Sequence, residues 1–176
     1  MPKNMANYLT IGRVLMIPVF LVLMYVDFPG SRYWALAVYI VACLTDFADG
    51  YIARHYHQVS DFGKFMDPLA DKCLVMAALC CFVEQGDMLA WILAVVLVRE
   101  FAVSGMRLVA VEKGRVIAAG WSGKIKTAST MVCICLILLG IPQWLNYVCQ
   151  GVILVTTVYS GIEYFVKNIG VFHHAP

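Results

Sequence analysis

Hydrophobic residues occur along the chain in six long stretches that are separated by short polar segments. The stretches cover residues 8–26, 33–53, 67–85, 88–110, 121–140 and 144–166. A helix needs about 20 residues to cross about 30 Å of hydrocarbon, and each stretch comes close to that length. The pattern therefore predicts an all-α, polytopic membrane protein with six transmembrane helices. Because only short loops remain, we interpret residues 1–176 as a single membrane domain with its functional groups at helix ends and in loops.

The composition supports this interpretation. Hydrophobic residues make up 62% of the chain and charged residues 14%, whereas soluble domains average about 45–50% and about 25%. These values exclude a disordered chain, a basic nucleic-acid-binding domain and an ordinary cytosolic enzyme. The first apolar stretch is interpreted as a membrane helix rather than a secretory signal, because no clear small-x-small cleavage site follows it before Ser31. All seven cysteines fall in apolar stretches, which indicates reduced thiols packed as small hydrophobes.

The basic residues lie on one side of the predicted helices. The flanking segments alternate sides, so the N-terminus, a loop at 54–66, the region 107–124 and the C-terminus share one side. Of the 13 basic residues, Arg32 alone falls on the opposite side and the other 12 fall on the shared side. By the positive-inside rule the shared side is cytoplasmic. We therefore predict a multi-pass protein with both termini in the cytoplasm, in the cytoplasmic membrane if the source is bacterial.

Apart from the acids near the ends of the apolar stretches, where solvation or a nearby lysine explains them, five acidic residues lie within or beside these stretches, where a charge is costly and by default indicates function. They are Asp46, Asp49, Asp67, Asp71 and Glu100. Helical spacing places Asp46 and Asp49 on one face, and it places Asp67 and Asp71 on another. A short loop joins the second and third predicted helices, so these helices should be antiparallel neighbours. The four aspartates are therefore expected to meet at one depth near the cytoplasmic surface.

Two interpretations of this acidic cluster are open. Four carboxylates at close range cannot all stay ionised without compensation. One solution is a lattice of salt bridges with Arg54, Lys64 and Lys72. The other is a divalent cation site, because Mg²⁺ and Mn²⁺ prefer carboxylate oxygens and often bridge substrate phosphates. We favour two Mg²⁺ or Mn²⁺ ions per site, which could clamp the attacking and leaving oxygens of a phosphoryl displacement.

A spaced motif supports the second interpretation. Residues 46–71 read D-x2-D-G-x2-A-R-x8-G-x3-D-x3-D, and the fixed positions are Asp46, Asp49, Gly50, Ala53, Arg54, Gly63, Asp67 and Asp71. This pattern resembles the signature of the CDP-alcohol phosphotransferases, also called CDP-alcohol phosphatidyltransferases. The resemblance implies a six-helix membrane enzyme, usually a homodimer. Such an enzyme passes the phosphatidyl group of a CDP-linked lipid to an alcohol and releases CMP.

The resemblance also implies roles for single residues. The metal ligands would be Asp46, Asp49, Asp67 and Asp71. Asp71 would in addition be the catalytic general base for the acceptor hydroxyl, which requires a metal that also acidifies that hydroxyl. The CDP-binding residues would be Asn7, Thr10, Asp49, Gly50, Ala53, Arg54 and Gly63.

Three further segments bear on the acceptor. The opening NMANYLTIGRVLMIP is similar to the PN-x-LT-x2-R-x4-P opening of the phosphatidylglycerophosphate synthases, with Ala6 in place of the usual proline. The RE-x6-R segment at 99–107 and GKIKT at 123–127 extend this resemblance over almost the whole chain. The resemblance implies glycerol 3-phosphate as the acceptor. The residues expected to bind its phosphate are Arg99, Arg107, Lys124 and Lys126.

Ordinary structural roles are the alternatives for these basic residues. Arg13 could extend its head group to the membrane surface. Arg99 and Glu100 could be paired for structural reasons. Two lysines at an inner membrane edge, here Lys124 and Lys126, are commonly topology determinants or lipid-headgroup contacts.

The sequence thus predicts transfer of a phosphatidyl group from CDP-diacylglycerol to glycerol 3-phosphate, giving phosphatidylglycerophosphate and CMP. The expected partners are these substrates, membrane lipids and a second copy of the chain, without nucleic acid. One alternative is the same chemistry with inositol phosphate, serine or phosphatidylglycerol as the acceptor. A cation transporter is a second alternative. It would place acids near the membrane midplane and often in paired halves, whereas these acids lie at one interface and no paired halves are visible.

Overall fold

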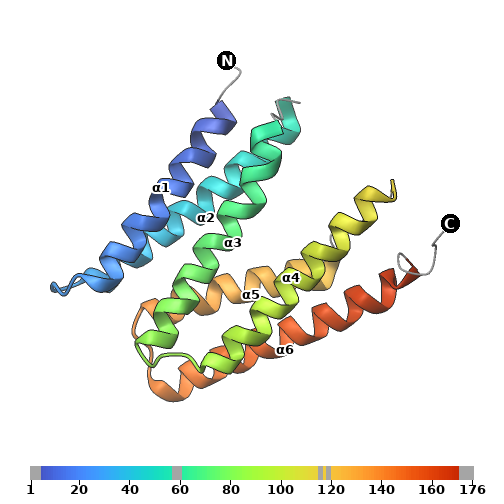
Figure 1. Ribbon diagram of the computed structural model, residues 1–176. Coiled ribbons are helices and arrows are strands. Elements are labelled where there is room, and N and C mark those ends of the chain that lie inside the picture. Colours follow the sequence, from blue (N-terminus) through green and yellow to red (C-terminus); the bar gives the residue numbers. More distant parts are fainter. Residues whose placement is uncertain (1–4, 57–60, 115–116, 118–119, 171–176) are drawn as a thin grey trace. The chain divides into compact units, whose positions relative to one another are not determined.

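A computed structural model of the chain consists of six α-helices, with no strand among the residues that it describes (Figure 1). The helices are α1 (Met5–Tyr25), α2 (Ser31–Tyr56), α3 (Asp61–Glu84), α4 (Ala90–Glu112), α5 (Trp121–Leu138) and α6 (Gln143–Asn168). The structure describes the chain except residues 1–4, 57–60, 115–116, 118–119 and 171–176, and it leaves out the side chains of 5–10, 46–56, 61–68 and 71 as well. The prediction of an all-α protein with six helices is confirmed.

The loop that hydropathy predicts at 54–66 is wrong in its extent. Helix α2 continues to Tyr56 and α3 begins at Asp61, so Arg54 and Gly63 lie in helices. Hydropathy records only the residues that prefer hydrocarbon, whereas backbone hydrogen bonds can continue a helix through polar residues. The motif residues therefore lie on two helices rather than on a helix and a loop.

The first compact unit consists of residues 1–84 with 138–140, and within it α1, α2 and α3 contact one another. Its core includes the rings of Phe20 on α1 and Tyr39 on α2, whose centroids are 6.1 Å apart. Arg13 on α1 is only 1% exposed. Its head group is therefore covered by protein, contrary to the alternative in which it extends to the membrane surface.

The second compact unit consists of residues 85–137 and 141–176 and contains α4, α6 and nearly all of α5. Helix α4 packs on α6, where Val103, Met106 and Tyr164 form a buried apolar cluster. Helix α5 is joined to α6 by a hydrogen bond of 3.3 Å from Ser129 Oγ to Thr156 Oγ1. This unit carries all four basic residues that the sequence assigns to the acceptor phosphate.

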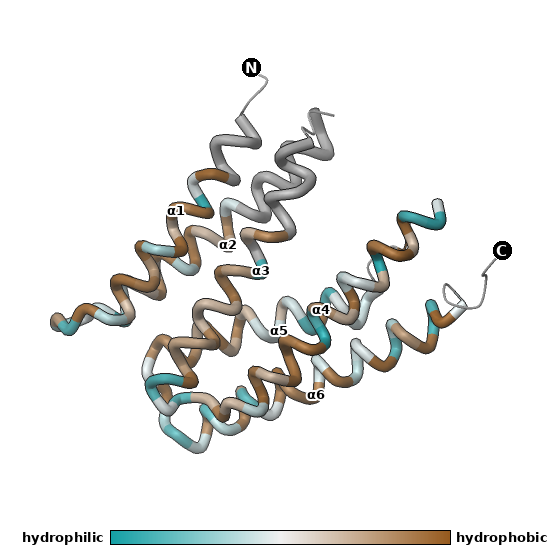
Figure 2. Tube along the Cα trace, in the orientation of Figure 1, coloured by the Kyte–Doolittle hydropathy of each residue, from teal (hydrophilic) through white to brown (hydrophobic). Residues whose placement is uncertain are grey.

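Two helices of the described chain, α5 and α6, are long and apolar enough to cross a membrane. Helix α4 is also long, but it carries three charged residues, Arg99, Glu100 and Arg107, within its apolar stretch. Hydrophobic residues dominate the helices, and hydrophilic ones gather mainly at turns and helix ends (Figure 2). Every helix exposes large apolar side chains, among them Leu15, Trp34, Leu69, Phe101, Val132 and Val155. Apolar exposure on this scale is typical of a membrane protein.

Candidate functional site

The acidic motif lies on two helices of the first unit. Asp46 and Asp49 are one turn apart on α2, and Asp67 and Asp71 are one turn apart on α3. The two helices run in opposite directions (Figure 1) and are joined by only four residues, 57–60. Both pairs therefore lie on the backbone at about 9–15 Å along the helix axis from this connection. The backbone thus carries the two pairs at similar distances from the connection, and their meeting at one depth in the membrane stays a prediction.

The remaining motif residues follow the same helices. Gly50, Ala53 and Arg54 lie on α2 and Gly63 lies on α3, whereas Asn7 and Thr10 lie on α1. Their side chains and those of the four aspartates lie outside the described residues. The metal-binding, CDP-binding and general-base assignments, and the alternative lattice of salt bridges, therefore stay predictions.

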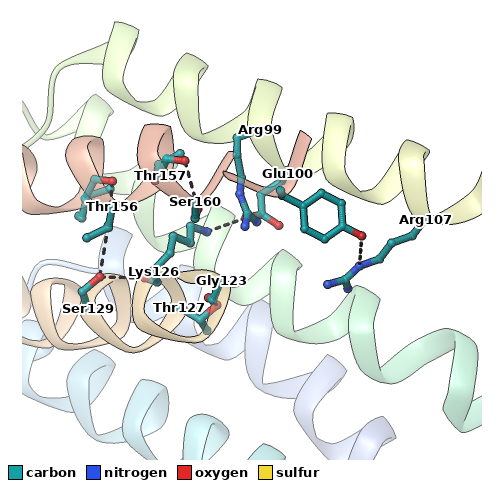
Figure 3. A network of polar contacts seen from close by, with 12 residues as sticks. Arg99, Glu100, Arg107, Gly123, Lys126, Thr127, Ser129, Thr156, Thr157 and Ser160 are labelled. Atoms are coloured by element: carbon teal, nitrogen blue, oxygen red, sulfur yellow. Dashed lines mark hydrogen bonds and ion pairs between the residues drawn. The ribbon is translucent and has the colours of Figure 1, made fainter. Parts of the chain in front are cut away.

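A buried polar cluster in the second unit joins α4 to α5 (Figure 3). Lys126 Nζ lies 2.6 Å from Glu100 Oε1, and Arg99 NH1 lies 2.9 Å from the same oxygen. The side chains of Arg99, Glu100 and Lys126 are only 13%, 11% and 6% exposed. Among the described side chains, two cations thus share one anion, which leaves one excess positive charge in a site with little solvent. Such a site favours an anionic ligand.

The sequence of α5 explains why a lysine is buried here. Lys126 shares a helical face with Thr130, Cys133, Ile134 and Ile137, at spacings of four, seven, eight and eleven residues. All of these residues are buried. Because this face is buried, Lys126 is directed inward, where Glu100 supplies its counter-charge.

The other two basic residues make their contacts elsewhere. Arg107 Nε donates a hydrogen bond of 3.2 Å to the Tyr164 hydroxyl, and its guanidinium lies 5.6 Å from the centre of the Tyr164 ring. Lys124 Nζ lies 5.0 Å from the centre of the exposed Trp121 ring. Residues two apart on a helix face different sides, which separates Lys124 from Lys126. The eight residues between Arg99 and Arg107 correspond to about 12 Å along α4.

A groove of about 560 Å³ lies between α4 and α6, beside the buried cluster. Its lining is Ala, Val, Ile and Phe, apart from Arg99, Thr157 and Gly161. The Thr157 hydroxyl is fully buried, and neither it nor Arg99 Nε makes a hydrogen bond to a residue that the structure describes. Because buried polar atoms are normally paired, these two atoms give the region unused capacity to bind a polar ligand.

Sequence reasoning did not anticipate two residues of this region, Tyr164 and Gly161. Tyr164 bonds Arg107 across 57 positions of the chain. Gly161 contacts the stem of Arg99. Both lie in an apolar stretch that hydropathy marks only as a membrane span, so no local signal indicates their partners.

Comparison with known proteins places the chain in a family. Residues 3–162 match the model of the CDP-alcohol phosphatidyltransferase family. The chain belongs to this family. The resemblance predicted from the spaced motif is therefore confirmed, and it extends well beyond the motif to most of the chain.

Individual relatives are similar to the chain over nearly its whole length. It is 38% identical to the CDP-diacylglycerol–glycerol-3-phosphate 3-phosphatidyltransferase of Bacillus subtilis strain 168, over 94% of this chain and 95% of the relative. It is 36% identical to a probable phosphatidylglycerophosphate synthase of Mycobacterium tuberculosis, over 94% of this chain and 82% of the relative. It is 34% identical to a Shigella flexneri protein with the same name as the Bacillus relative, over 93% and 94%.

Proposed function

We propose that this protein transfers the phosphatidyl group of CDP-diacylglycerol to glycerol 3-phosphate, giving phosphatidylglycerophosphate and CMP. The observation that carries the proposal is the similarity to relatives named for this reaction, which covers 94% of this chain and 95% of the Bacillus relative. The protein is accordingly a transferase of phospholipid biosynthesis.

The reaction exchanges one P–O bond for another. A hydroxyl oxygen of glycerol 3-phosphate bonds to the phosphorus that carries the diacylglycerol. The bond from that phosphorus to the oxygen of the CMP phosphate breaks, and CMP leaves with the electron pair. Asp71 accepts the proton of the attacking hydroxyl. Both substrates are anionic, so the chain must supply positive charge or bind cations.

The acidic motif fits a divalent metal site. Its donors are carboxylates in two pairs, each one turn apart, on two continuous helices of one unit. Oxygen donors of this kind suit Mg²⁺ and Mn²⁺. Two such ions, when bound, stabilise the charge on the attacking and leaving oxygens. Asp46, Asp49, Asp67 and Asp71 would hold these ions. The residues that would bind the CDP moiety are Asn7, Thr10, Asp49, Gly50, Ala53, Arg54 and Gly63.

The cluster around Glu100 fits the acceptor phosphate. Arg99 and Lys126 converge on one carboxylate oxygen and leave an excess positive charge among the described side chains. Arg99 also retains an Nε without a hydrogen bond to any described residue. These two residues form the inner part of the acceptor-phosphate site, and Arg107 and Lys124 contribute from its periphery. A neutral alcohol would not require such a site.

The membrane arrangement follows from the charge distribution. All six helices span the bilayer, both termini lie in the cytoplasm, and the aspartates lie near the inner interface. In this position the acyl chains of the lipid substrate stay in hydrocarbon while its nucleotide stays in water. The protein functions as a homodimer, as is usual in the family.

An acceptor panel tests the proposed reaction. The purified protein is incubated with labelled CDP-diacylglycerol and Mg²⁺, together with glycerol 3-phosphate, inositol phosphate, serine or phosphatidylglycerol, and products are identified by mass. We expect phosphatidylglycerophosphate from glycerol 3-phosphate and no transfer to the other three. Transfer to another alcohol but not to glycerol 3-phosphate would overturn the acceptor assignment and leave the family membership intact.

Release of CMP tests the metal site. We expect release to stop when Mg²⁺ and Mn²⁺ are chelated and to return when either is restored. Asp67→Ala and Asp71→Ala should reduce release to background, because each removes a ligand of the proposed site. Asp61→Ala changes an acid on the same helix outside the motif and should retain activity. Activity that survives in Asp67→Ala or Asp71→Ala contradicts the site assignment.

A further inference from the structure

Arg99 reaches the cluster by crossing a glycine on the neighbouring helix. A Cβ atom placed on Gly161 of α6 would lie 3.2 Å from Arg99 Cγ. At the far end of the side chain, NH1 binds Glu100, and NH2 lies 3.7 Å from the position of a Cβ on Gly123 of α5. The stem of Arg99 therefore passes α6 at Gly161. Its guanidinium ends near Gly123, at the beginning of α5 (Figure 3).

The space at Gly161 is limited by Arg99 rather than by helix packing. Arg99 Cγ is the only heavy atom within 4 Å of the Cβ position, among described residues outside the immediate backbone of α6. The optimal separation of two carbon atoms is about 3.5–4.0 Å. A methyl group on Gly161 would therefore push against the Arg99 stem.

A push on the Arg99 stem is expected to move its guanidinium, because the side chain is held at both ends. Its side chain is only 13% exposed, and NH1 is held by the Glu100 carboxylate. Groups that bind a substrate must be held within about 0.5 Å of the productive geometry. A displacement of a few tenths of an ångström at Cγ, carried to the end of a long side chain, is comparable with that tolerance.

We propose that Gly161 is a positioning residue for the acceptor-phosphate site. It touches no substrate, and it acts by leaving room for the stem of Arg99. This inference rests on the proposed function, in which Arg99 binds the phosphate group of glycerol 3-phosphate. It predicts that a methyl group at this position weakens acceptor binding and leaves the binding of CDP-diacylglycerol unchanged.

Three glycine-to-alanine variants give a graded test. Gly151 lies on the same helix, and a Cβ there would meet nothing within 4 Å. We expect Gly161→Ala to raise the KM for glycerol 3-phosphate about tenfold or more, Gly123→Ala to raise it less, and Gly151→Ala to leave it unchanged. The KM for CDP-diacylglycerol should stay constant in all three variants. Gly161→Ala and Gly151→Ala should melt at similar temperatures, since both replace a helical glycine by a better helix former.

A double-mutant cycle with Arg99→Ala shows whether Gly161 acts through Arg99. Removal of the arginine stem removes the contact, so Gly161→Ala should have no further effect in that background. Calorimetric titration with glycerol 3-phosphate provides the same comparison for variants that turn over too slowly for kinetics. Equal effects of Gly161→Ala with and without Arg99 would overturn the proposal.

The remaining outcomes are also decisive. If Gly161→Ala behaves like Gly151→Ala in acceptor KM and titration, the positioning role is wrong. If Gly161→Ala melts well below Gly151→Ala and both substrate KM values change together, the glycine has a packing role instead. The wild-type protein tests the proposed function separately from the role of Gly161. If the wild type does not use glycerol 3-phosphate, the proposed function is overturned, and the role of Gly161 that rests on it falls as well.

Discussion

Glu100 is the residue on which the buried charges of the second unit depend. Its Oε1 accepts hydrogen bonds from Lys126 at 2.6 Å and from Arg99 at 2.9 Å, and all three side chains are mostly buried. A buried ion pair adds little net stability over an apolar pair, but removing one partner leaves an uncompensated charge. Here the loss of one anion would leave two cations.

We therefore expect Glu100→Gln to destabilise the protein by about 3 kcal/mol, measured by unfolding in detergent. A matched control is Glu163→Gln, which removes the partner of Lys167 in an exposed pair spaced four residues apart on α6. Exposed ion pairs contribute little to the free energy of unfolding, so Glu163→Gln should unfold like the wild type. Equal stability of Glu100→Gln and Glu163→Gln would show that the cluster is not buried as described.

At the scale of the helices, the start of α4 is capped by another helix. The residue before α4, Leu89, offers no side-chain cap, although the first N–H groups of a helix lack partners within it. Gln150 of α6 accepts a hydrogen bond from the Leu89 N–H at 3.2 Å. Gln150 and Asn146 also donate to the Asp87 carbonyl, at 3.0 and 2.9 Å. Both side chains are buried, so α6 fixes the beginning of the helix that carries Arg99 and Glu100.

Gln150→Leu should destabilise the second unit by about 1–2 kcal/mol, because the Leu89 N–H loses a partly buried partner and the Asp87 carbonyl loses a donor. The measurement is again unfolding in detergent. Gln143→Leu, at the exposed first residue of the same helix, should have little effect. An unchanged stability of Gln150→Leu would mean that the start of α4 does not depend on this cap.

At the scale of the whole molecule, the charge distribution predicts how the chain crosses the membrane. Only Arg32 among 13 basic residues falls on the predicted outer side. The connection between α4 and α5 begins at Lys113 on the basic side, whereas the connection between α3 and α4 contains Asp87 on the other side. The positive-inside rule then places Lys113 and the C-terminus in the cytoplasm.

Reporter fusions in a bacterial host test this topology. Green fluorescent protein fused after Lys113 or at the C-terminus should fluoresce, and alkaline phosphatase fused after Asp87 should be active, because each reporter functions on one side only. Alkaline phosphatase activity after Lys113 would invert the orientation. If alkaline phosphatase were inactive at both Lys113 and Asp87, both positions would lie on the cytoplasmic side, which would contradict the predicted passage of α4 through the membrane.

The number and order of the helices follow from the sequence, because an apolar stretch of membrane-spanning length and its polar flanks are local features. The family is likewise readable from local spacing, since eight fixed residues between Asp46 and Asp71 form its motif. Helix ends are less readable, and α2 and α3 extend into the loop predicted at 54–66 because backbone hydrogen bonds do not stop where hydropathy falls. The roles of the motif side chains stay predictions.

By itself, then, the sequence determined the helical class, the family motif and the candidate basic residues, all of which depend on neighbours a few positions apart. Only the tertiary structure decided which basic residues share an anion. It joins Lys126 to Glu100 across 26 positions, directs Arg107 to Tyr164 across 57, and leaves Lys124 on an exposed tryptophan. It also passes the stem of Arg99 over Gly161. Such contacts depend on how each helix is rotated and packed against its neighbours, and residues far apart in the chain meet only through that packing.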